Sequence, residues 1–129
     1  SEANLDLKIN VPEEKIYIRA DGRRLYRVME NLFSNISKYS LPNTRVYIDI
    51  TKDENSVKLT MKNISSYELN FDPGEIMERF KRADDSRNTE GSGLGLSIAK
   101  DLVKLQGGSF DIDIDGDLFK AIVQFNLYK

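Results

Sequence analysis

Three glycines, Gly91, Gly93 and Gly95, alternate with other residues directly before an apolar pattern typical of a helix. Glycines let backbone N–H groups approach an anion closely, and a helix N-terminus adds about half a positive charge. A dinucleotide-binding fingerprint needs a strand just before the glycines, and a P-loop needs Gly-Lys-Ser/Thr after them. Neither context is present, so the segment predicts a phosphate-binding loop of another class. A flexible hinge with close helix packing explains the glycines alone equally well.

A polar stripe on an earlier helical segment supplies a second set of candidate ligands. Asn31, Asn35 and Lys38 fall within about 60° of one another on a helical wheel, beside an apolar arc. An amide oxygen suits Mg²⁺ and an ammonium group pairs with phosphate. Tyr39, at the edge of the arc, can stack on a base. Taken alone, the stripe is explained better as an ordinary solvated helix face.

Basic residues precede the glycines in a polar stretch, Lys81 to Ser92, which has no periodicity and predicts a mobile loop. Arg82 and Arg87 can fold over phosphates from this loop. Asp84 and Asp85 dilute the positive charge, so solvation alone also explains the run.

Composition excludes several kinds of chemistry. The 129 residues contain no Cys and no His, which excludes disulfides, thiolate zinc sites, Ser/His/Asp triads and histidine bases. A net charge of −2 offers no global attraction to nucleic acid or to an anionic membrane. No apolar run approaches the roughly 18 residues that cross a bilayer. We expect a soluble chain with one domain over residues 5–129, preceded by a linker or remnant over residues 1–4.

Hydrophobic periodicity and turn residues predict the elements that hold these groups. Their arrangement predicts an α+β fold, a two-layer sandwich in which helices cover one face of a mixed, mostly antiparallel sheet. The expected strands are Leu5 to Val11, Lys15 to Arg19, Arg45 to Lys52, Val57 to Lys62, Ser109 to Ile114 and Leu118 to Leu127. The expected helices are Gly22 to Tyr39, capped by Asp21, then Pro73 to Phe80 and Gly93 to Gln106.

Three motifs together resemble the catalytic, ATP-binding domain of bacterial sensor histidine kinases, of the GHKL or Bergerat type. They are Asn31-x-x-x-Asn35-x-x-Lys38-Tyr39, Glu78-Arg79-Phe80-Lys81-Arg82, and Gly91-Ser-Gly-Leu-Gly-Leu-Ser-Ile-Ala-Lys100. They match the family's N, F and G2 boxes, and the resemblance covers nearly the whole chain. All three in order are far more specific than any one alone.

The resemblance implies a role for each matching residue. Asn35 would coordinate Mg²⁺ with Asn31 nearby, and Tyr39 would lie against adenine. The phosphates would be met by the basic residues Lys38, Arg82 and Arg87 and by the glycine segment, Gly91, Gly93, Leu94, Gly95 and Leu96.

The resemblance also implies a reaction and its partners. Sensor kinases transfer the γ-phosphoryl group of ATP to a His on a separate dimerisation domain, and then to an Asp of a response regulator. Because this chain has no His, we expect that it cannot autophosphorylate alone. Asn31 stands where related ATP hydrolases carry a Glu that acts as a general base on water. An amide cannot accept that proton. By analogy the parent protein is a membrane-anchored homodimer with this domain in the cytoplasm, and the fragment itself is a soluble monomer.

One motif departs from the family pattern. The G1 box, Asp-x-Gly-x-Gly, is replaced by the stretch from Asn63 to Tyr67, which lacks both glycines. The Asn63 side-chain oxygen can still accept the bond from the adenine amino group, with weaker binding than a carboxylate gives. Two alternatives to a histidine kinase therefore remain: a degenerate docking module, and a stand-alone serine kinase of the anti-sigma-factor type.

Overall fold

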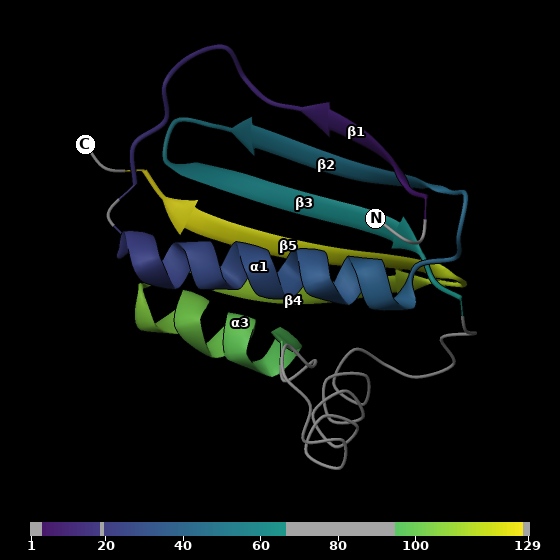
Figure 1. Cartoon of the computed structure of the whole chain (residues 1–129). Coiled ribbons are helices and arrows are strands. Elements are labelled where there is room, and N and C mark those ends of the chain that lie inside the picture. The colour runs from purple at the N-terminus through teal and green to yellow at the C-terminus, as the bar shows by residue number, and fades with distance from the viewer. Residues whose placement is uncertain (1–3, 19, 67–94, 128–129) are drawn as a thin grey trace.

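The computed structural model describes residues 4–18, 20–66 and 95–127 (Figure 1). Along these residues five strands and two helices follow one another in the order β1, α1, β2, β3, α3, β4, β5. Their bounds are β1 Asp6–Asn10, α1 Gly22–Tyr39, β2 Arg45–Lys52, β3 Ser56–Ile64, α3 Gly95–Leu105, β4 Ser109–Asp115 and β5 Leu118–Asn126.

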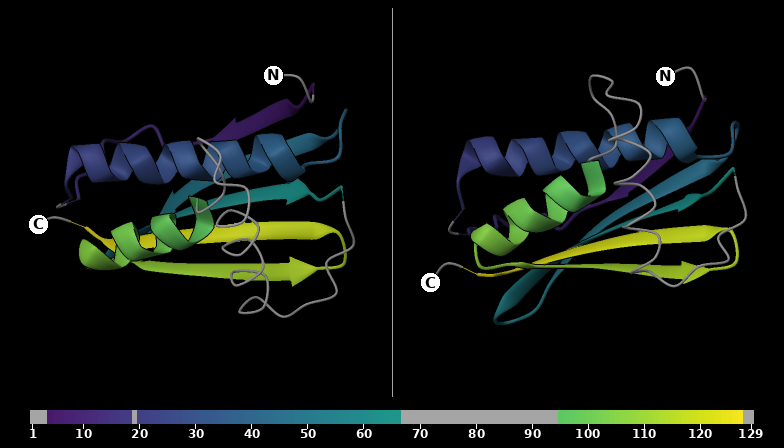
Figure 2. Two further views of the ribbon diagram at one scale, coloured as in Figure 1. Left: turned by 60° about the horizontal axis from the view of Figure 1, so that its bottom comes forward. Right: turned by 90° about the horizontal axis from the view of Figure 1, so that it is seen from below.

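The strands form one mixed sheet in the order β1-β2-β3-β5-β4. β1 runs parallel to β2, and the other neighbouring pairs are antiparallel. Both helices lie on the same face of this sheet, and they lie side by side (Figures 1 and 2). The predicted fold class, a two-layer α+β sandwich with a mostly antiparallel sheet, is therefore confirmed.

α1 begins where the sequence predicted a cap. The Asp21 carboxylate accepts hydrogen bonds from the backbone N–H groups of Arg23 at 2.9 Å and Arg24 at 3.2 Å. These bonds satisfy two of the donors that a helix start leaves unpaired. Val28, Leu32 and Ile36, spaced four residues apart, then fall on one face and are buried at 0 to 5% exposure. This apolar arc fixes which way the neighbouring asparagines point.

α3 ends in a Schellman motif. The backbone N–H of Gly107 donates to Lys104 O, and that of Gly108 donates to Val103 O, both at 3.0 Å. Gly107 has φ of +81°, a conformation that L side chains rarely adopt. At Gly108 a Cβ would lie only 2.7 Å from the Phe125 ring. The backbone just before β4 therefore packs so close to β5 that only glycine fits there without a shift.

Most predicted elements are confirmed to within two residues wherever the structure describes them. One prediction is wrong: residues 15–18 form no strand, and their only strand-like pairing is a single bridge between Ile18 and Leu127. The apolar alternation there is real, because Ile16 and Ile18 border the interior, but this segment crosses from β1 to α1 without a strand beside it. Alternation of apolar and polar residues indicates which side of a segment is buried, but it does not indicate whether a neighbouring strand pairs with it.

β3 is longer than predicted. It runs past Lys62 to Ile64, because Asn63 and Ile64 pair with Phe119 and Leu118 of β5. The predicted helix from Pro73 to Phe80 and the loop from Lys81 to Ser92 lie outside the described residues, as do the first two residues of the helix predicted from Gly93.

Candidate functional site

The C-terminal end of α1 is joined to the end of β3 by backbone hydrogen bonds. The N–H of Leu41 donates to Ile64 O at 2.8 Å, and the N–H of Ser66 donates to Tyr39 O at 2.8 Å. Between these two bonds, Ser40 and Ser65 form an isolated antiparallel bridge. The last turn of α1 is thereby held in a fixed position relative to the sheet, which is a precondition for a precise site.

Asn63 lies in this junction and is buried at 3% exposure. Its Nδ2 donates to Ser40 Oγ at 2.8 Å. Its Oδ1 is also buried but has no hydrogen-bond partner. The serine therefore orients the amide by holding one end and leaves the acceptor end free for a donor from outside the protein.

Asn35 faces the same junction from α1. With Asn63 and the apolar side chains around them, it lines a narrow gap between the helix and the sheet that is too small to admit a water molecule. Asn35 is 5% exposed, and its Oδ1 has no partner. One turn earlier on the helix, the Nδ2 of Asn31 is likewise buried and unpaired.

These three atoms form a coherent set. Among the described residues, the buried side-chain N and O atoms without a hydrogen-bond partner are Asn31 Nδ2, Asn35 Oδ1 and Asn63 Oδ1. Leaving such a group unsatisfied costs about 1 to 3 kcal/mol each, so proteins seldom retain them without a reason. All three belong to residues singled out from the sequence. Asn31 and Asn35 lie in the C-terminal half of α1, and Asn63 lies near the end of β3.

The rest of the polar stripe is more exposed. Lys38 is exposed in the last turn of α1, and Tyr39 is half-buried as its final residue. The alternative of an ordinary solvated helix face therefore fits Lys38 but not Asn35, which is almost wholly buried. The stripe combines buried amides with an ammonium group at the surface.

α3 begins beside the same part of α1. Just after α3, Gln106 Oε1 accepts a hydrogen bond from the Asp21 backbone N–H at 2.7 Å, so the two helices run antiparallel with these ends together. A helix rises about 1.5 Å per residue, so the 11 residues of α3 reach back to about the level of Leu32. The N-terminus of α3 is thus placed level with the turn between Asn31 and Asn35.

The glycine segment is described only at its end. Gly95 is the first residue of α3, and the Leu96 side chain is fully buried in the core at 0% exposure. Any contact of Leu96 with a phosphate must therefore come from its backbone N–H. The remaining predicted ligands, Arg82, Arg87, Gly91, Gly93 and Leu94, lie outside the described residues, and their contacts stay predictions.

Sequence reasoning missed Ser40 and Ser65. Both serines are buried, at 3% and 7% exposure, and Ser40 orients Asn63. Ser40 follows the helix directly, where no periodic pattern marks a residue as buried, so no signal in the sequence identifies it. In the described part of the chain, no group of three or more His, Cys, Asp or Glu is placed to hold a metal ion.

Comparison with known proteins identifies the family of the chain. Residues 20–127 match the family described as histidine kinase-, DNA gyrase B-, and HSP90-like ATPase. The "Probable sensor protein PcoS" of Escherichia coli is 37% identical over 101 residues, covering 77% of this chain and 22% of PcoS. Sensor histidine kinase WalK of Bacillus subtilis (strain 168) is 30% identical over 116 residues, covering 87% of this chain and 19% of WalK. The chain spans about a fifth of the length of these two relatives.

Solved structures share the fold. The mycobacterial sensor histidine kinase MprB superposes with a TM-score of 0.76 at 22% identity, covering 97% of this chain and 83% of that one. The nucleotide-free catalytic domain of histidine kinase ThkA gives a TM-score of 0.78 at 21% identity, covering 97% and 80%. The chain belongs to the histidine kinase-, DNA gyrase B-, and HSP90-like ATPase family. Within it, the chain is a catalytic, ATP-binding domain of the bacterial sensor histidine kinase type.

Proposed function

We propose that this domain binds ATP with Mg²⁺ at the C-terminal end of α1 and transfers the γ-phosphoryl group to a histidine on a separate dimerisation domain. The observation that carries the proposal is the set of three unpaired amide atoms on Asn31, Asn35 and Asn63. Two are acceptors and one is a donor, which matches a ligand with an amino group, a cation and anionic oxygens.

Asn63 is the residue suited to recognise adenine. Its free Oδ1 accepts a hydrogen bond from the 6-amino group, while Ser40 holds the Nδ2 end. Guanine and hypoxanthine carry a carbonyl oxygen at that position, which would face Oδ1 acceptor to acceptor. Asn63 therefore provides discrimination among bases as well as affinity. Tyr39, half-buried beside it at the end of α1, supplies an aromatic surface for the base.

Lys38, Gly95 and Leu96 are suited to the phosphates. Lys38 is exposed on the last turn of α1, where its ammonium group can pair with phosphate oxygens. The start of α3, at Gly95, adds backbone N–H groups and the positive end of the helix dipole. Arg82 and Arg87 extend this set by resemblance.

The donor set fits Mg²⁺. Asn35 Oδ1 is a hard oxygen ligand that the protein leaves without any other partner. When bound with the triphosphate, the ion supplies positive charge that neutralises the phosphate oxygens. Asn35 would hold it, and the Asn31 Nδ2, one turn away, would donate to a phosphate oxygen.

Asn31 also bears on the type of reaction. An amide cannot take a proton from water, so this position does not supply the general base that hydrolysis requires. Transfer needs instead a nucleophile from outside. The histidine nitrogen forms a bond to the γ-phosphorus, the bond to the bridging oxygen breaks, and its electron pair leaves with ADP. The imidazole releases its proton to solvent.

The partners follow from the same proposal. The chain contains no His, so the acceptor histidine lies on a dimerisation domain, and the phosphoryl group then passes to a response regulator. We place the domain in the cytoplasm of a membrane-anchored homodimeric sensor. Of the helices in the described residues, none is long and apolar enough to cross a bilayer.

The first test is calorimetric titration of the chain with ATP, ADP and inosine triphosphate, with and without Mg²⁺. We expect micromolar to low-millimolar binding that favours adenine and responds to Mg²⁺. No binding of any nucleotide would mean that the replaced glycine motif has disabled the site, leaving a docking module as the better account. Transfer is tested by adding a purified dimerisation domain and γ-labelled ATP. Acid-labile label on histidine is expected, and label on serine would favour the anti-sigma type instead.

Asn35→Ala tests the metal ligand. We expect loss of the Mg²⁺-dependent part of ATP affinity, by about tenfold or more, with an unchanged circular dichroism spectrum. Asn10→Ala is the matched control, because Asn10 is exposed on the edge strand β1. Equal Mg²⁺ dependence in the two variants would remove Asn35 from the site.

A further inference from the structure

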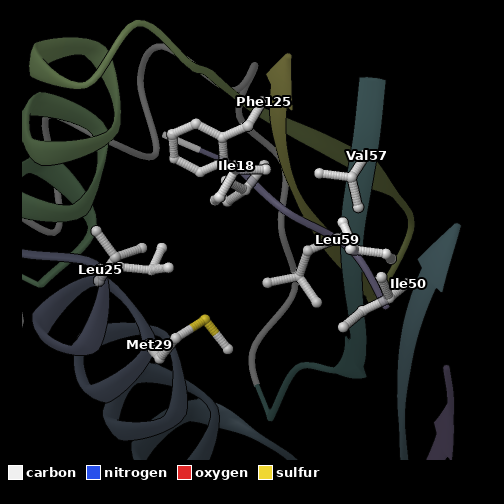
Figure 3. A pocket seen from close by; sticks show the side chains of 10 residues that line it. Ile18, Leu25, Met29, Ile50, Val57, Leu59 and Phe125 are labelled. Atoms are coloured by element: carbon white, nitrogen blue, oxygen red, sulfur yellow. The ribbon is translucent and has the colours of Figure 1, made fainter. Parts of the chain in front are cut away.

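The core is incomplete at the end of the sandwich opposite Asn63. Between the N-terminal half of α1 and the sheet lies a cavity of about 310 Å³. Figure 3 shows Leu25 and Met29 of α1 on one side of it, facing Leu59 and Ile50 of the sheet across an open space. The space is partly open to solvent, and a concave apolar site of this size is the usual form of a small-molecule binding site.

The walls of the cavity come from three parts of the chain. α1 contributes one wall, strands β2, β3 and β5 contribute the second, and residues 16–18, which cross from β1 to α1, contribute the third. Every lining side chain is apolar, including Ile18, Val57 and Phe125. A water molecule needs two to four polar partners to be held in a buried site. No lining side chain offers one, so water in the cavity has no polar side chain to hold it in place.

The cavity is accessible from solvent. Leu25, Met29, Ile50, Val57 and Leu59 are each only partly buried, whereas Val28, Val123 and Phe125, which also line the cavity, are 0 to 6% exposed. The lining side chains therefore keep apolar surface in contact with water inside a concave site. Covering such surface with an apolar molecule is favourable by about 25 cal/mol per Å². This end of the domain has the shape and chemistry of a ligand site.

We propose that this cavity binds a small uncharged apolar molecule, an aromatic of one or two rings or an aliphatic chain of similar volume. The volume sets the size, because an apolar cavity of roughly 150 Å³ stays dry and takes up one benzene. A cavity of about 310 Å³ is twice as large. The absence of charged or hydrogen-bonding side chains among its lining residues excludes recognition of a polar head group inside it. The site is separate from the nucleotide site and does not depend on the proposed function.

The test uses naphthalene as the probe and the chain without nucleotide. Methyl groups of Ile, Leu and Val are isotope-labelled and followed by NMR during the titration. We expect saturable shifts at Ile18, Leu25, Val57 and Leu59. The chemical shifts of methyl groups at the nucleotide end of the core, such as those of Leu32 and Ile36, should not change.

Ile50→Phe blocks the proposed site, because Ile50 lines the cavity and a ring there occupies part of it. The matched control is Ile122→Phe, the same change on β5 at a position that alternates with the buried Ala121 and Val123 and so faces away from the helices. We expect naphthalene affinity to fall about tenfold or more in Ile50→Phe and to stay at the original value in Ile122→Phe. Val57→Leu, a smaller addition to the same wall, repeats the test if the Ile50→Phe chain does not give a native spectrum.

The outcomes separate cleanly. Saturable shifts that are lost on filling the cavity and kept in the control support the site. Absence of shifts in the unmodified chain overturns it, and so does binding that Ile50→Phe and Val57→Leu leave unchanged. Neither result bears on ATP binding, which calorimetry measures independently.

Discussion

Replacing Asn63 with Asp introduces the carboxylate of the family's G1 box. The effect of this change on ATP affinity can be worked out from the contacts of Asn63. A hydrogen bond to a neutral acceptor contributes about 0.5 to 1.5 kcal/mol, and one to a charged acceptor about 1.5 to 3 kcal/mol. At 3% exposure, little solvent screens this difference. A gain of about 1.4 kcal/mol corresponds to tenfold tighter binding. We therefore expect Asn63→Asp to bind ATP about tenfold more tightly.

The same substitution should destabilise the domain without nucleotide. The Nδ2 donor to Ser40 is lost, although the serine hydroxyl can turn and donate to the new carboxylate. Burial without a cation disfavours the charged form and raises the pKa of the introduced carboxyl group. The folded state then binds the proton more tightly than the unfolded state. Stability is therefore highest below the unfolded pKa and falls as the pH rises through the folded pKa. We expect a cost of at least about 1 kcal/mol at neutral pH.

The assay pairs calorimetry with urea unfolding at acidic and neutral pH. Inosine triphosphate is the ligand control, because its carbonyl oxygen cannot donate to the carboxylate and its binding should not improve. Asn10→Asp is the charge-matched protein control, since Asn10 is exposed on the edge strand β1. The reasoning fails if ATP and inosine triphosphate gain equally, or if ATP affinity is unchanged while the fold is intact. Either result would place Asn63 outside the adenine site.

Two further predictions concern the stability of the fold. Gly108→Ala should lower the free energy of unfolding by about 1 to 3 kcal/mol in urea titrations, because the added Cβ would lie 2.7 Å from the Phe125 ring; an unchanged midpoint would mean that β4 moves away without cost. Asp53, in the β2–β3 turn, has its pKa lowered below the ordinary value of 3.8, first by the backbone N–H of Asn55 and next by that of Ser56. A lowered folded pKa stabilises the fold above the unfolded pKa, and this contribution is lost as the pH falls through the folded pKa. Asp53→Asn should therefore flatten the acid side of the stability profile below pH 3.8, and an unaltered profile would contradict the assignment.

Much of the fold follows from the sequence because local signals coincide with the tertiary contacts. The apolar arc of Val28, Leu32 and Ile36 predicts both the existence of α1 and the face it buries. The hairpin of β2 and β3 follows from alternation on both sides of a polar turn. The strand predicted at residues 15–18 is wrong because its local signal does not coincide with a neighbouring paired strand. Its alternation reflects burial on one side, and pairing depends on a neighbouring strand that the local sequence does not encode.

The sequence predicts the residues of the proposed site, but it does not predict how they are buried or held. Helical spacing placed Asn31, Asn35 and Lys38 on one stripe, but it could not show that Asn35 is buried while Lys38 is exposed. That difference arises from the sheet beneath α1 and from the junction with β3. Ser40 was missed altogether, because its role depends on a partner 23 residues away, Asn63. Long-range hydrogen bonds of this kind produce no periodic pattern in the sequence.

α1 contacts two regions that lower the stability of the domain. At its C-terminal end, the unpaired amide atoms of Asn31, Asn35 and Asn63 carry an unsatisfied polar cost. At its N-terminal end, Leu25 and Met29 face a cavity that the chain does not fill. Between them the side chains of the apolar arc are buried in the core. Natural sequences depart from full packing and full pairing chiefly where function requires it. The two departures are chemically opposite, one polar and one apolar, which is why they point to two different ligands bound to one helix.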